Sequence, residues 1–560
     1  MNTTPDSKAS GHVAPVLSIQ ALSVRLAGPE TSRRVVREVS FDVYPGETLC
    51  VVGESGSGKS VSAFSVMGLL PKNGLRPAGG RILVDGEDVL TASPKRLRAL
   101  RATRMAMVFQ EPMTALNPVQ TVGCQIDEVL RIHTRQDGKT RRANVLAMLA
   151  AVHMPEPDRI YDAYPHQLSG GQRQRVVICM ALILKPRLLI ADEPTTALDV
   201  TTQKQILALI RELQEKFNTA VLFITHDFGV VAEIADRIVV MNKGTVVEVA
   251  SRDDILARPR EAYTRMLVSS VPSLVPRHRE ASRADIVLDV QGLHKTYSTR
   301  RLFGGGRAVA AAQDVALTVR RGEIVGVVGE SGSGKSTLAR CIVRLIDPTS
   351  GSIRIHGAEI ATVQGSTLRP LRQRIQIVFQ DPYRSLNPRV KVGDSIIEGL
   401  LNFGMTRDAA LARAAALLSM VGLDASALQR YPHQFSGGQR QRICIARALA
   451  LEPDIVVADE AVSALDVSVQ AQVLALLDEI RERTGVAVLF ITHDLRVAAQ
   501  ICDTIVVMQR GQVVESGPAA EVLTEPRCAY TRALIEAAPG RNWDFQNFRP
   551  MATSDTVVSV

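Results

Sequence analysis

The stretch "GESGSGKSV" at residues 53–61 occurs a second time as "GESGSGKST" at residues 329–337. Both copies fit the pattern G-x-x-x-x-G-K-[ST], in which the glycines let backbone N–H groups curl around a phosphate. In this pattern the lysine reaches the β- and γ-phosphates, and the serine hydroxyl can ligate Mg²⁺. The sequence therefore predicts two phosphate-binding loops in one chain.

The residues on either side of each loop favour the same interpretation. Apolar runs suited to buried strands precede the loops ("TLCVVG", "EIVGVVG"), and regular helical stretches follow them ("KSVSAFSVMGLL", "KSTLARCIVRLI"). A helix N-terminus favours a bound anion because its dipole and unpaired N–H groups point at the charge. The candidate phosphate-binding residues are Gly53, Ser55, Gly56, Gly58, Lys59 and Ser60 in the first copy, and Gly329, Ser331, Gly332, Gly334, Lys335 and Ser336 in the second.

Composition excludes several classes of protein. The chain has 560 residues, with 46% hydrophobic and 22% charged residues, which is ordinary for a globular protein of several domains. We find no apolar run of about 18 residues that could span a bilayer, and we expect no secretory signal in "MNTTPDSKASGHVAP". Seven dispersed cysteines without a C-x-x-C pair argue against a disulfide scaffold or zinc site and suit the cytoplasm. The net charge of +9 could indicate binding to nucleic acid or to a membrane surface, but no block of five or six like charges occurs, so dispersed, solvated positive charges are the favoured interpretation.

The two loops belong to a long internal repeat. "VFQEPMTALNP" (108–118) recurs as "VFQDPYRSLNP" (378–388), and "YPHQLSGGQRQR" (164–175) recurs as "YPHQFSGGQRQR" (431–442). "VLFITHD" occurs identically at 221–227 and 488–494. A period of this length indicates a duplicated domain rather than a solenoid.

The repeat also predicts the domain boundaries. "EAYTRML" (261–267) matches "CAYTRAL" (528–534), so the first copy ends near residue 270. The polar segment that follows is interpreted as a basic, disordered tether. We therefore expect a disordered N-terminus at 1–15, a first domain at 16–270, a linker at 271–286, a second domain at 287–540 and a C-terminal tail at 541–560.

Each copy also carries acids and a histidine suited to phosphate chemistry. "RLLIADE" and "DIVVADE" are apolar runs that end in two acids. A buried strand of this kind would place the aspartate beside the loop to hold Mg²⁺. The glutamate would point to the other face of the strand and polarise an attacking water. The candidates are Asp192 and Asp459 for the metal, Glu193 and Glu460 as general bases, and His226 and His493 as γ-phosphate sensors.

The "SGGQ" motif supplies a second candidate anion site in each copy. Each motif precedes a regular helical stretch, so its serine is a good N-cap, and the helix start is suited to binding an anion. The residues are Ser169, Gly170, Gly171 and Gln172, and Ser436, Gly437, Gly438 and Gln439.

Together these motifs resemble those of the ATP-binding subunits of ABC transporters. The sequences "FQEPMTALNP" and "YPHQLSGGQRQR" are similar to those of one subgroup, the importers of dipeptides, oligopeptides, glutathione and nickel complexes. The resemblance implies an α/β fold of two tandem P-loop NTPase (ABC-type) domains, each with a RecA-like core, an antiparallel β subdomain and a helical subdomain. It further implies that the halves pair head to tail, so that the loop of one and the "SGGQ" of the other enclose one ATP. Gln110 and Gln380 would sense Mg²⁺ and link to the membrane subunits.

The same resemblance implies which partners and ligands the chain has and where it lies in the cell. Two integral-membrane permeases would be the partners, with an extracytoplasmic solute-binding protein in the complex and no nucleic acid. The chain would lie peripherally on the cytoplasmic face of the inner membrane, with ATP and Mg²⁺ as ligands.

The sequence departs from the family pattern at a few positions. Tyr297 fits the aromatic that stacks on adenine, but Leu26 stands at the equivalent place in the first half. Val61 lacks the hydroxyl that Thr337 could offer the α-phosphate. Residues 259–287 contain no cysteine, so we expect no iron–sulfur centre.

The sequence alone is compatible with two other functions. One is a soluble twin-domain ABC ATPase that acts on the ribosome or nucleic acid, although such proteins separate their halves by a long charged arm and this linker is short. The other is a non-catalytic binding module, which the presence of both glutamates and both histidines disfavours.

Overall fold

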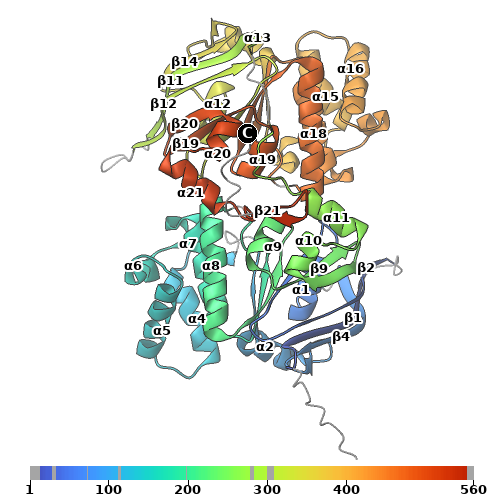
Figure 1. The fold of residues 1–560 in the computed structure, drawn as a ribbon, viewed down its shortest axis with the longest axis vertical. Helices are drawn as coiled ribbons and strands as arrows, with labels where there is room; N and C mark the ends of the chain where they lie inside the picture. Colours follow the sequence, from blue (N-terminus) through green and yellow to red (C-terminus); the bar gives the residue numbers. More distant parts are fainter. Residues whose placement is uncertain are drawn as a thin grey trace, which may run out of the picture. The chain divides into compact units, whose positions relative to one another are not determined.

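The computed structural model describes residues 13–27, 33–71, 73–110, 115–196, 198–277, 283–298, 308–463 and 465–551. The chain divides into two compact units, the first ending at Arg265 and the second beginning at Met266, except that residues 199–201 group with the second. The fold is α/β, and each unit contains one six-stranded and one four-stranded sheet (Figure 1). Most of the predicted disordered N-terminus lies outside the described residues.

The six-stranded sheet of the first unit carries the predicted loop. Its order is β10 (Thr245–Ser251), β9 (Arg237–Asn242), β3 (Thr48–Val52), β8 (Ala220–Ile224), β7 (Leu188–Asp192) and β6 (Met105–Val108). All neighbours are parallel except β10, which is antiparallel to β9. Every residue of β3, β7 and β8 is buried, as expected for central parallel strands covered on both faces.

A four-stranded antiparallel sheet lies beside it, in the order β2 (Arg34–Val43), β1 (Leu17–Leu26), β4 (Leu75–Val84) and β5 (Glu87–Asp88). One hydrophobic core joins this sheet to the parallel sheet, and helix α1 (Lys59–Met67) contributes Ala63 and Val66 to it. The position of α1 in this core holds the loop that precedes it against the end of β3.

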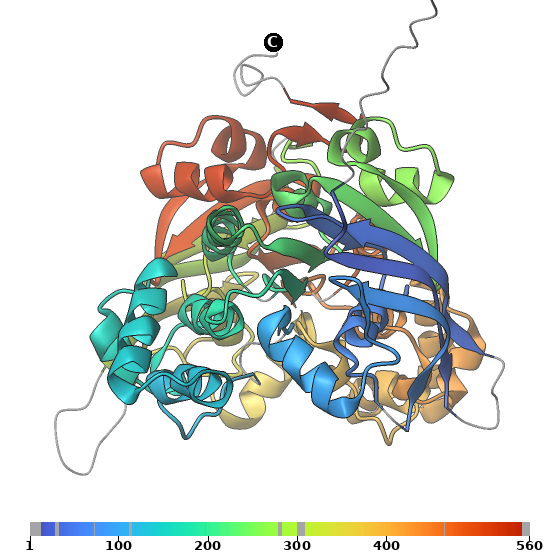
Figure 2. The same ribbon diagram turned by 90° about the horizontal axis from the view of Figure 1, so that it is seen from below.

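The first half of the chain contains further helices, and the last of them, α11, continues past Arg265 into the second unit. They are α2 (Pro94–Thr103), α4 (Val122–His133), α5 (Gly138–Ala151), α6 (Pro157–Asp162), α7 (Gly170–Leu182), α8 (Val200–Phe217), α9 (Phe228–Ile234), α10 (Arg252–Ala257) and α11 (Ala262–Ser269). Helices α4 to α6 gather on the opposite side of the unit from β1, β2 and β4 (Figures 1 and 2). Helix α4 is typical of the group: Thr121 caps its N-terminus, and Arg131 and His133 lie in its last turn, where the dipole favours cations.

The second unit repeats this architecture. Its six-stranded sheet runs β16 (Ile375–Val378), β17 (Ile455–Asp459), β18 (Ala487–Thr492), β13 (Ile324–Val328), β19 (Thr504–Gln509) and β20 (Gln512–Pro518). Its four-stranded sheet runs β12 (Ala308–Arg320), β11 (Ile286–Ser298), β14 (Ser350–Ile355) and β15 (Ala358–Glu359). Its helices are α12 (Lys335–Ile342), α13 (Leu368–Arg374), α14 (Pro382–Ser385), α15 (Val392–Asn402), α16 (Arg407–Met420), α17 (Gly437–Leu449), α18 (Val467–Thr484), α19 (Leu495–Ile501), α20 (Ala519–Thr524) and α21 (Ala529–Ala537).

The segment expected to be a disordered tether differs from that expectation at residues 271–277. Leu274 packs against the hydrophobic core of the second unit. The Ser273 carbonyl accepts a hydrogen bond of 3.1 Å from Gln500 Nε2, and Arg277 N–H donates one of 3.2 Å to the Ala499 carbonyl. Apolar burial and backbone hydrogen bonds therefore hold this part of the segment to the second unit.

The described part of the C-terminal tail also has regular structure. Strands β21 (Trp543–Asp544) and β22 (Arg549–Pro550) form an antiparallel hairpin. Phe545 is fully buried, and Asp544 accepts a hydrogen bond of 2.8 Å from Asn547 Nδ2. Burial of the Phe545 ring and the hydrogen bond to the Asp544 carboxylate in the turn explain why residues 541–551 have a defined structure.

Candidate nucleotide-binding sites

Residues 53–60 and 329–336, here called the first and second phosphate loops, connect the central strand of each parallel sheet to a helix. Gly53 and Gly329 have φ values of 149° and 151°. A Cβ at either position would lie 2.2 Å from a carbonyl oxygen, that of Met241 or Met508. Only glycine fits there, because the loop passes so close to the neighbouring strand β9 or β19.

The lysine of each loop is buried and bonds to the loop itself. Lys59 Nζ donates to the carbonyls of Gly53 at 2.6 Å and Glu54 at 3.0 Å. Lys335 Nζ makes the same bonds to Gly329 at 2.7 Å and Glu330 at 2.8 Å. Burial lowers the pKa of Lys335, although the nearby carboxylates of Glu460 and Asp459 oppose this. Each ammonium thus lies inside the curl of backbone where a phosphate is expected.

The predicted metal ligands lie together in both units. Ser60 Oγ donates to Asp192 Oδ1 at 3.1 Å, and Ser336 Oγ donates to Asp459 Oδ1 at the same distance. Burial raises the pKa of Asp192 to about 6 and raises the pKa of Asp459 as well.

These oxygens fit Mg²⁺. The ion prefers oxygen ligands and is usually held by one or two carboxylates together with the phosphates of a substrate. Among the described residues, there is no cluster of three or more histidine, cysteine, aspartate and glutamate side chains that could hold a metal ion. A serine hydroxyl and a carboxylate, together with the phosphates of a nucleotide, match the oxygen ligands that Mg²⁺ prefers.

The candidate general bases adopt a conformation that the sequence did not indicate. Glu193 and Glu460 have φ values of 47° and 49°, in the left-handed region that costs a non-glycine residue about 1–3 kcal/mol. Their N–H groups still bond to β8 and β18, at the carbonyls of Ile224 (2.9 Å) and Ile491 (3.0 Å). The backbone turn after the aspartate, rather than the alternation of strand faces, separates the two carboxylates.

Among the described residues, three side chains lie within hydrogen-bond distance of the Glu193 carboxylate. Gln110 Nε2 donates to Oε2 at 2.8 Å, Thr196 Oγ1 donates to Oε2 at 3.0 Å, and His226 Nδ1 lies 3.1 Å from Oε1. Burial favours the neutral acid, but the hydrogen bond and charge of His226 outweigh it and hold the pKa of Glu193 at about 2. The predicted base is therefore ionised and oriented.

Glu460 is held more loosely. Gln380 Nε2 donates to its Oε2 at 2.8 Å, as in the first unit, but His493 Nδ1 lies 3.5 Å from the same oxygen. Ser463, which replaces Thr196, donates to the Glu460 backbone carbonyl instead of the carboxylate. Burial would raise the pKa of Glu460, but the His493 hydrogen bond lowers it.

The "SGGQ" residues form helix N-termini, as the sequence predicted. Ser169 Oγ accepts from Gln172 N–H at 3.3 Å and Gln172 Oε1 accepts from Ser169 N–H at 3.0 Å, which is a capping box. Ser436 and Gln439 repeat it at 3.3 and 3.1 Å. Both serines are exposed.

The positions that depart from the family pattern have defined environments. Leu26 and Tyr297 lie near the ends of the equivalent strands β1 and β11, and they are 36% and 42% exposed. The Lys295 ammonium lies 5.2 Å from the centre of the Tyr297 ring. Val61 packs against the core of the first unit.

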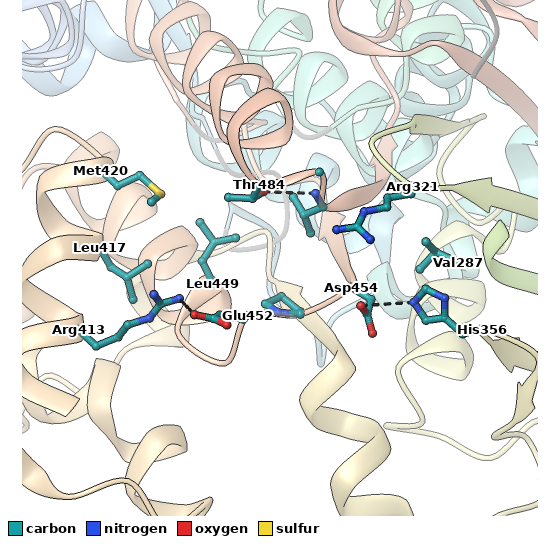
Figure 3. Close-up of a pocket in the computed structure, with 13 residues that line it drawn as sticks. Val287, Arg321, His356, Arg413, Leu417, Met420, Leu449, Glu452, Asp454 and Thr484 are labelled. Carbon is teal, nitrogen blue, oxygen red and sulfur yellow. Dashed lines mark hydrogen bonds and ion pairs between the residues drawn. The ribbon is translucent and has the colours of Figure 1, made fainter. Parts of the chain in front are cut away.

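A pocket of about 380 Å³ in the second unit lies away from these residues (Figure 3). Asp454 and Val486 directly precede β17 and β18, so the pocket is at the amino end of the parallel strands, whereas the phosphate loop is at the carboxyl end. His356 pairs with Asp454 at 3.3 Å, and Arg413 pairs with Glu452 at 2.7 Å. Arg413 and Glu452 therefore neutralise each other in the lining of this pocket.

Comparisons with known proteins identify the class. Residues 36–196 and 312–463 match the family described as "ABC transporter", and residues 247–303 and 514–551 match "Oligopeptide/dipeptide transporter, C-terminal region". The chain is 47% identical to the peptidoglycan transport ATP-binding protein YejF of Agrobacterium fabrum, over 94% of this chain and 96% of that protein. It is 46% identical to the glutathione import ATP-binding protein GsiA of Pectobacterium atrosepticum, over 94% and 89%.

The chain belongs to the ABC transporter family, and it is an ATP-binding protein whose ATPase activity powers transport. These relatives do not support the alternative of an ATPase that acts on the ribosome or nucleic acid. In the parts of the chain that the structure describes, every helix is too short or too polar to cross a bilayer.

The unequal support of the two glutamates gives a first prediction. Thr196→Ala removes a hydrogen bond to a carboxylate, worth about 1.5–3 kcal/mol, so we expect it to lower kcat for ATP by about tenfold or more. Ser463→Ala removes a bond to a backbone carbonyl and should lower kcat by less than about twofold. Steady-state ATP turnover of the purified variants measures both, and equal losses would contradict the asymmetry.

The unequal pair Leu26 and Tyr297 gives a second prediction. An aromatic stack on a base is worth about 1–3 kcal/mol, so the site of Lys59 should bind ATP more weakly than the site of Lys335. Tyr297→Leu should weaken binding to the second loop, and the reciprocal Leu26→Tyr should strengthen binding to the first. Nucleotide titrations in Lys59→Ala and Lys335→Ala backgrounds isolate each site. If neither substitution changes the affinity, these two positions do not contact adenine.

Proposed function

We propose that this chain energises the import of small peptides or peptide-like solutes through two separate integral-membrane permeases. The observation that carries the proposal is the match of residues 247–303 and 514–551 to the oligopeptide/dipeptide transporter C-terminal region. The relatives named for glutathione import and peptidoglycan transport act on solutes that contain peptide bonds. The solutes in the family description and in the names of these two relatives therefore share one chemical feature, the peptide bond.

In this proposal each phosphate loop binds the phosphates of one ATP. Ser60, Gln110 and Asp192, and their counterparts Ser336, Gln380 and Asp459, would hold Mg²⁺, which neutralises charge on the phosphates when it is bound. Glu193 and Glu460 orient an attacking water and accept its proton. His226 and His493, already beside these carboxylates, contact the γ-phosphate.

We further infer that the two halves pair head to tail, so that each ATP meets the phosphate loop of one half and the "SGGQ" motif of the other. Two features support this. The capped helix starts at Ser169 and Ser436 are exposed, and helix N-termini favour phosphate. Fusion of the halves in one chain supplies both at high effective concentration, so one copy of the chain serves one transporter.

A groove of the first unit is suited to a permease. It has a volume of about 300 Å³ and lies between α1, α2 and β6 on one side and α4 and α7 on the other. Its lining is mostly apolar and includes Met107, Phe109, Met180 and Leu184. Phe109 is 41% exposed and directly precedes Gln110, whose amide holds Glu193. A permease helix seated here would contact Phe109, next to the glutamine whose amide bonds to the proposed general base Glu193.

In the second unit, exposed aromatic and apolar side chains follow Gln380. Tyr383 is 64% exposed, and its ring centre lies 3.8 Å from the Arg440 guanidinium carbon. Phe403 and Met405 are also exposed. The sequences after Gln110 and Gln380, "EPMTALNP" and "DPYRSLNP", are similar but not identical, as expected if the two permeases differ. The proposal places the chain on the cytoplasmic face of the inner membrane, where a solute-binding protein acts through the assembled complex.

The catalytic part of the proposal has a direct test. Glu193→Gln and Glu460→Gln should each lower ATP turnover by about 100-fold or more, because a positioned base contributes about 10²–10⁴ to the rate. Each variant should also retain bound ATP. Glu212→Gln, an exposed carboxylate on α8, is the matched control and should keep wild-type turnover. Near-normal turnover in either site variant would make that site regulatory.

The permease part has a separate test. Leu184→Glu places a charge in the groove of the first unit, and we expect the chain to lose most of its association with the permeases. Val249→Glu adds the same charge on the exposed face of β10 and serves as control. Co-purification of membrane proteins with each variant measures the effect. Equal recovery of permeases with both variants would show that this groove is not the docking surface.

A further inference from the structure

In each unit, a tyrosine from a helix near the C-terminal end of that unit reaches the phosphate loop. Tyr263 on α11 has its Oη 3.4 Å from Glu54 N, which donates to it, and the same hydroxyl donates to Glu54 Oε2 at 3.4 Å. Tyr530 on α21 accepts a hydrogen bond of 3.1 Å from Glu330 N–H. The contact occurs in both copies of the duplicated domain, across more than 190 residues of sequence in each.

The residue that the tyrosine contacts is also the residue that the loop lysine contacts. The carbonyl of Glu54 accepts from Lys59 Nζ, and the carbonyl of Glu330 accepts from Lys335 Nζ. The tyrosine therefore holds the amide on one side of this residue while the lysine holds the carbonyl on the other. A shift of the tyrosine would move the peptide that sets the position of the ammonium.

The helix that carries the tyrosine is itself oriented by a carboxylate. Glu248 on β10 accepts hydrogen bonds from the N–H groups of Arg260 (2.9 Å) and Glu261 (3.2 Å), just before α11 begins. Glu515 on β20 makes the same bonds to Arg527 (2.7 Å) and Cys528 (3.1 Å) before α21. An anion at a helix N-terminus is favoured by the helix dipole.

The tyrosines are suited to a positional role. Both are half-buried, and Tyr530 packs against the core of its unit. Burial raises the pKa of Tyr530 to about 12, so its hydroxyl stays protonated at neutral pH. All four side chains, Glu248, Tyr263, Glu515 and Tyr530, lie in the segments that match the oligopeptide/dipeptide transporter C-terminal region.

We propose that Tyr263 and Tyr530 are positioning residues for ATP binding, through which the C-terminal segment of each half sets the conformation of its phosphate loop. The inference rests on the proposed roles of Lys59 and Lys335 in that site. If the inference is correct, the C-terminal segments affect the affinity for ATP through these two tyrosines.

The test uses the hydroxyl alone. Tyr263→Phe and Tyr530→Phe keep the ring and should raise the KM for ATP by about three- to tenfold, the range for one hydrogen bond, with kcat changed by less than about twofold. Tyr44→Phe is the matched control, because Tyr44 is a half-exposed tyrosine outside both phosphate loops, and its KM should stay at the wild-type value. A wild-type KM in both Tyr263→Phe and Tyr530→Phe, or a loss confined to kcat, would overturn the proposal.

A double-mutant cycle separates positioning from general destabilisation. Glu248→Ala should also raise the KM, and Glu248→Ala combined with Tyr263→Phe should match Tyr263→Phe alone, because both act through one hydroxyl. Fully additive effects would contradict the proposed route.

Direct ATP titration of the Glu193→Gln/Glu460→Gln chain shows whether a negative result contradicts the proposed function or only the role of the tyrosines. Absence of ATP binding in this chain with both tyrosines intact would overturn the proposed function itself. Binding that is equally tight with and without the tyrosine hydroxyls would overturn this inference alone.

Discussion

One hydrogen bond in each unit joins the phosphate loop to the buried strand beside it, from Ser60 to Asp192 and from Ser336 to Asp459. Burying a carboxylate is costly unless it is hydrogen-bonded, so the aspartate at the end of its strand requires this partner. The bond sets the loop against the carboxyl end of the parallel sheet. The lysine, the candidate general base and the histidine all lie at that edge of the sheet.

The duplication shows which features of the site are under tight geometric constraint. The bonds from lysine to the loop, from serine to aspartate and from glutamine to glutamate differ by about 0.2 Å or less between the units. The surroundings of the histidines differ more. Arg496, which replaces Gly229, is buried, and it bonds Asp494 at 2.9 Å and the Pro539 carbonyl at 3.4 Å. The start of α19 after His493 is thus tied to the C-terminal segment in a way that glycine cannot reproduce, so the surroundings of the two candidate nucleotide sites differ.

Most of the fold and much of the candidate site could be predicted from the sequence, because buried parallel strands and phosphate loops leave strong local patterns. The left-handed backbone of Glu193 could not, since a glutamate carries no signal for positive φ. The bond from Gln110 to Glu193 spans 83 residues and depends on tertiary structure. The repeated "AYTR" around Tyr263 and Tyr530 did carry a signal, but it served only to locate the end of each domain. Residues 271–277 have a defined conformation because they pack on the second unit, which their local composition did not indicate.

The central claim is that ATP hydrolysis by this chain drives a peptide-like solute across a membrane. Its most direct test is uptake of labelled glutathione and short peptides into vesicles that contain the chain together with the permeases that co-purify with it. The account predicts uptake that requires ATP on the side of this chain and that stops when both Glu193 and Glu460 are replaced by glutamine. ATP hydrolysis without uptake of any peptide-like solute, or uptake that persists in the double variant, would contradict it.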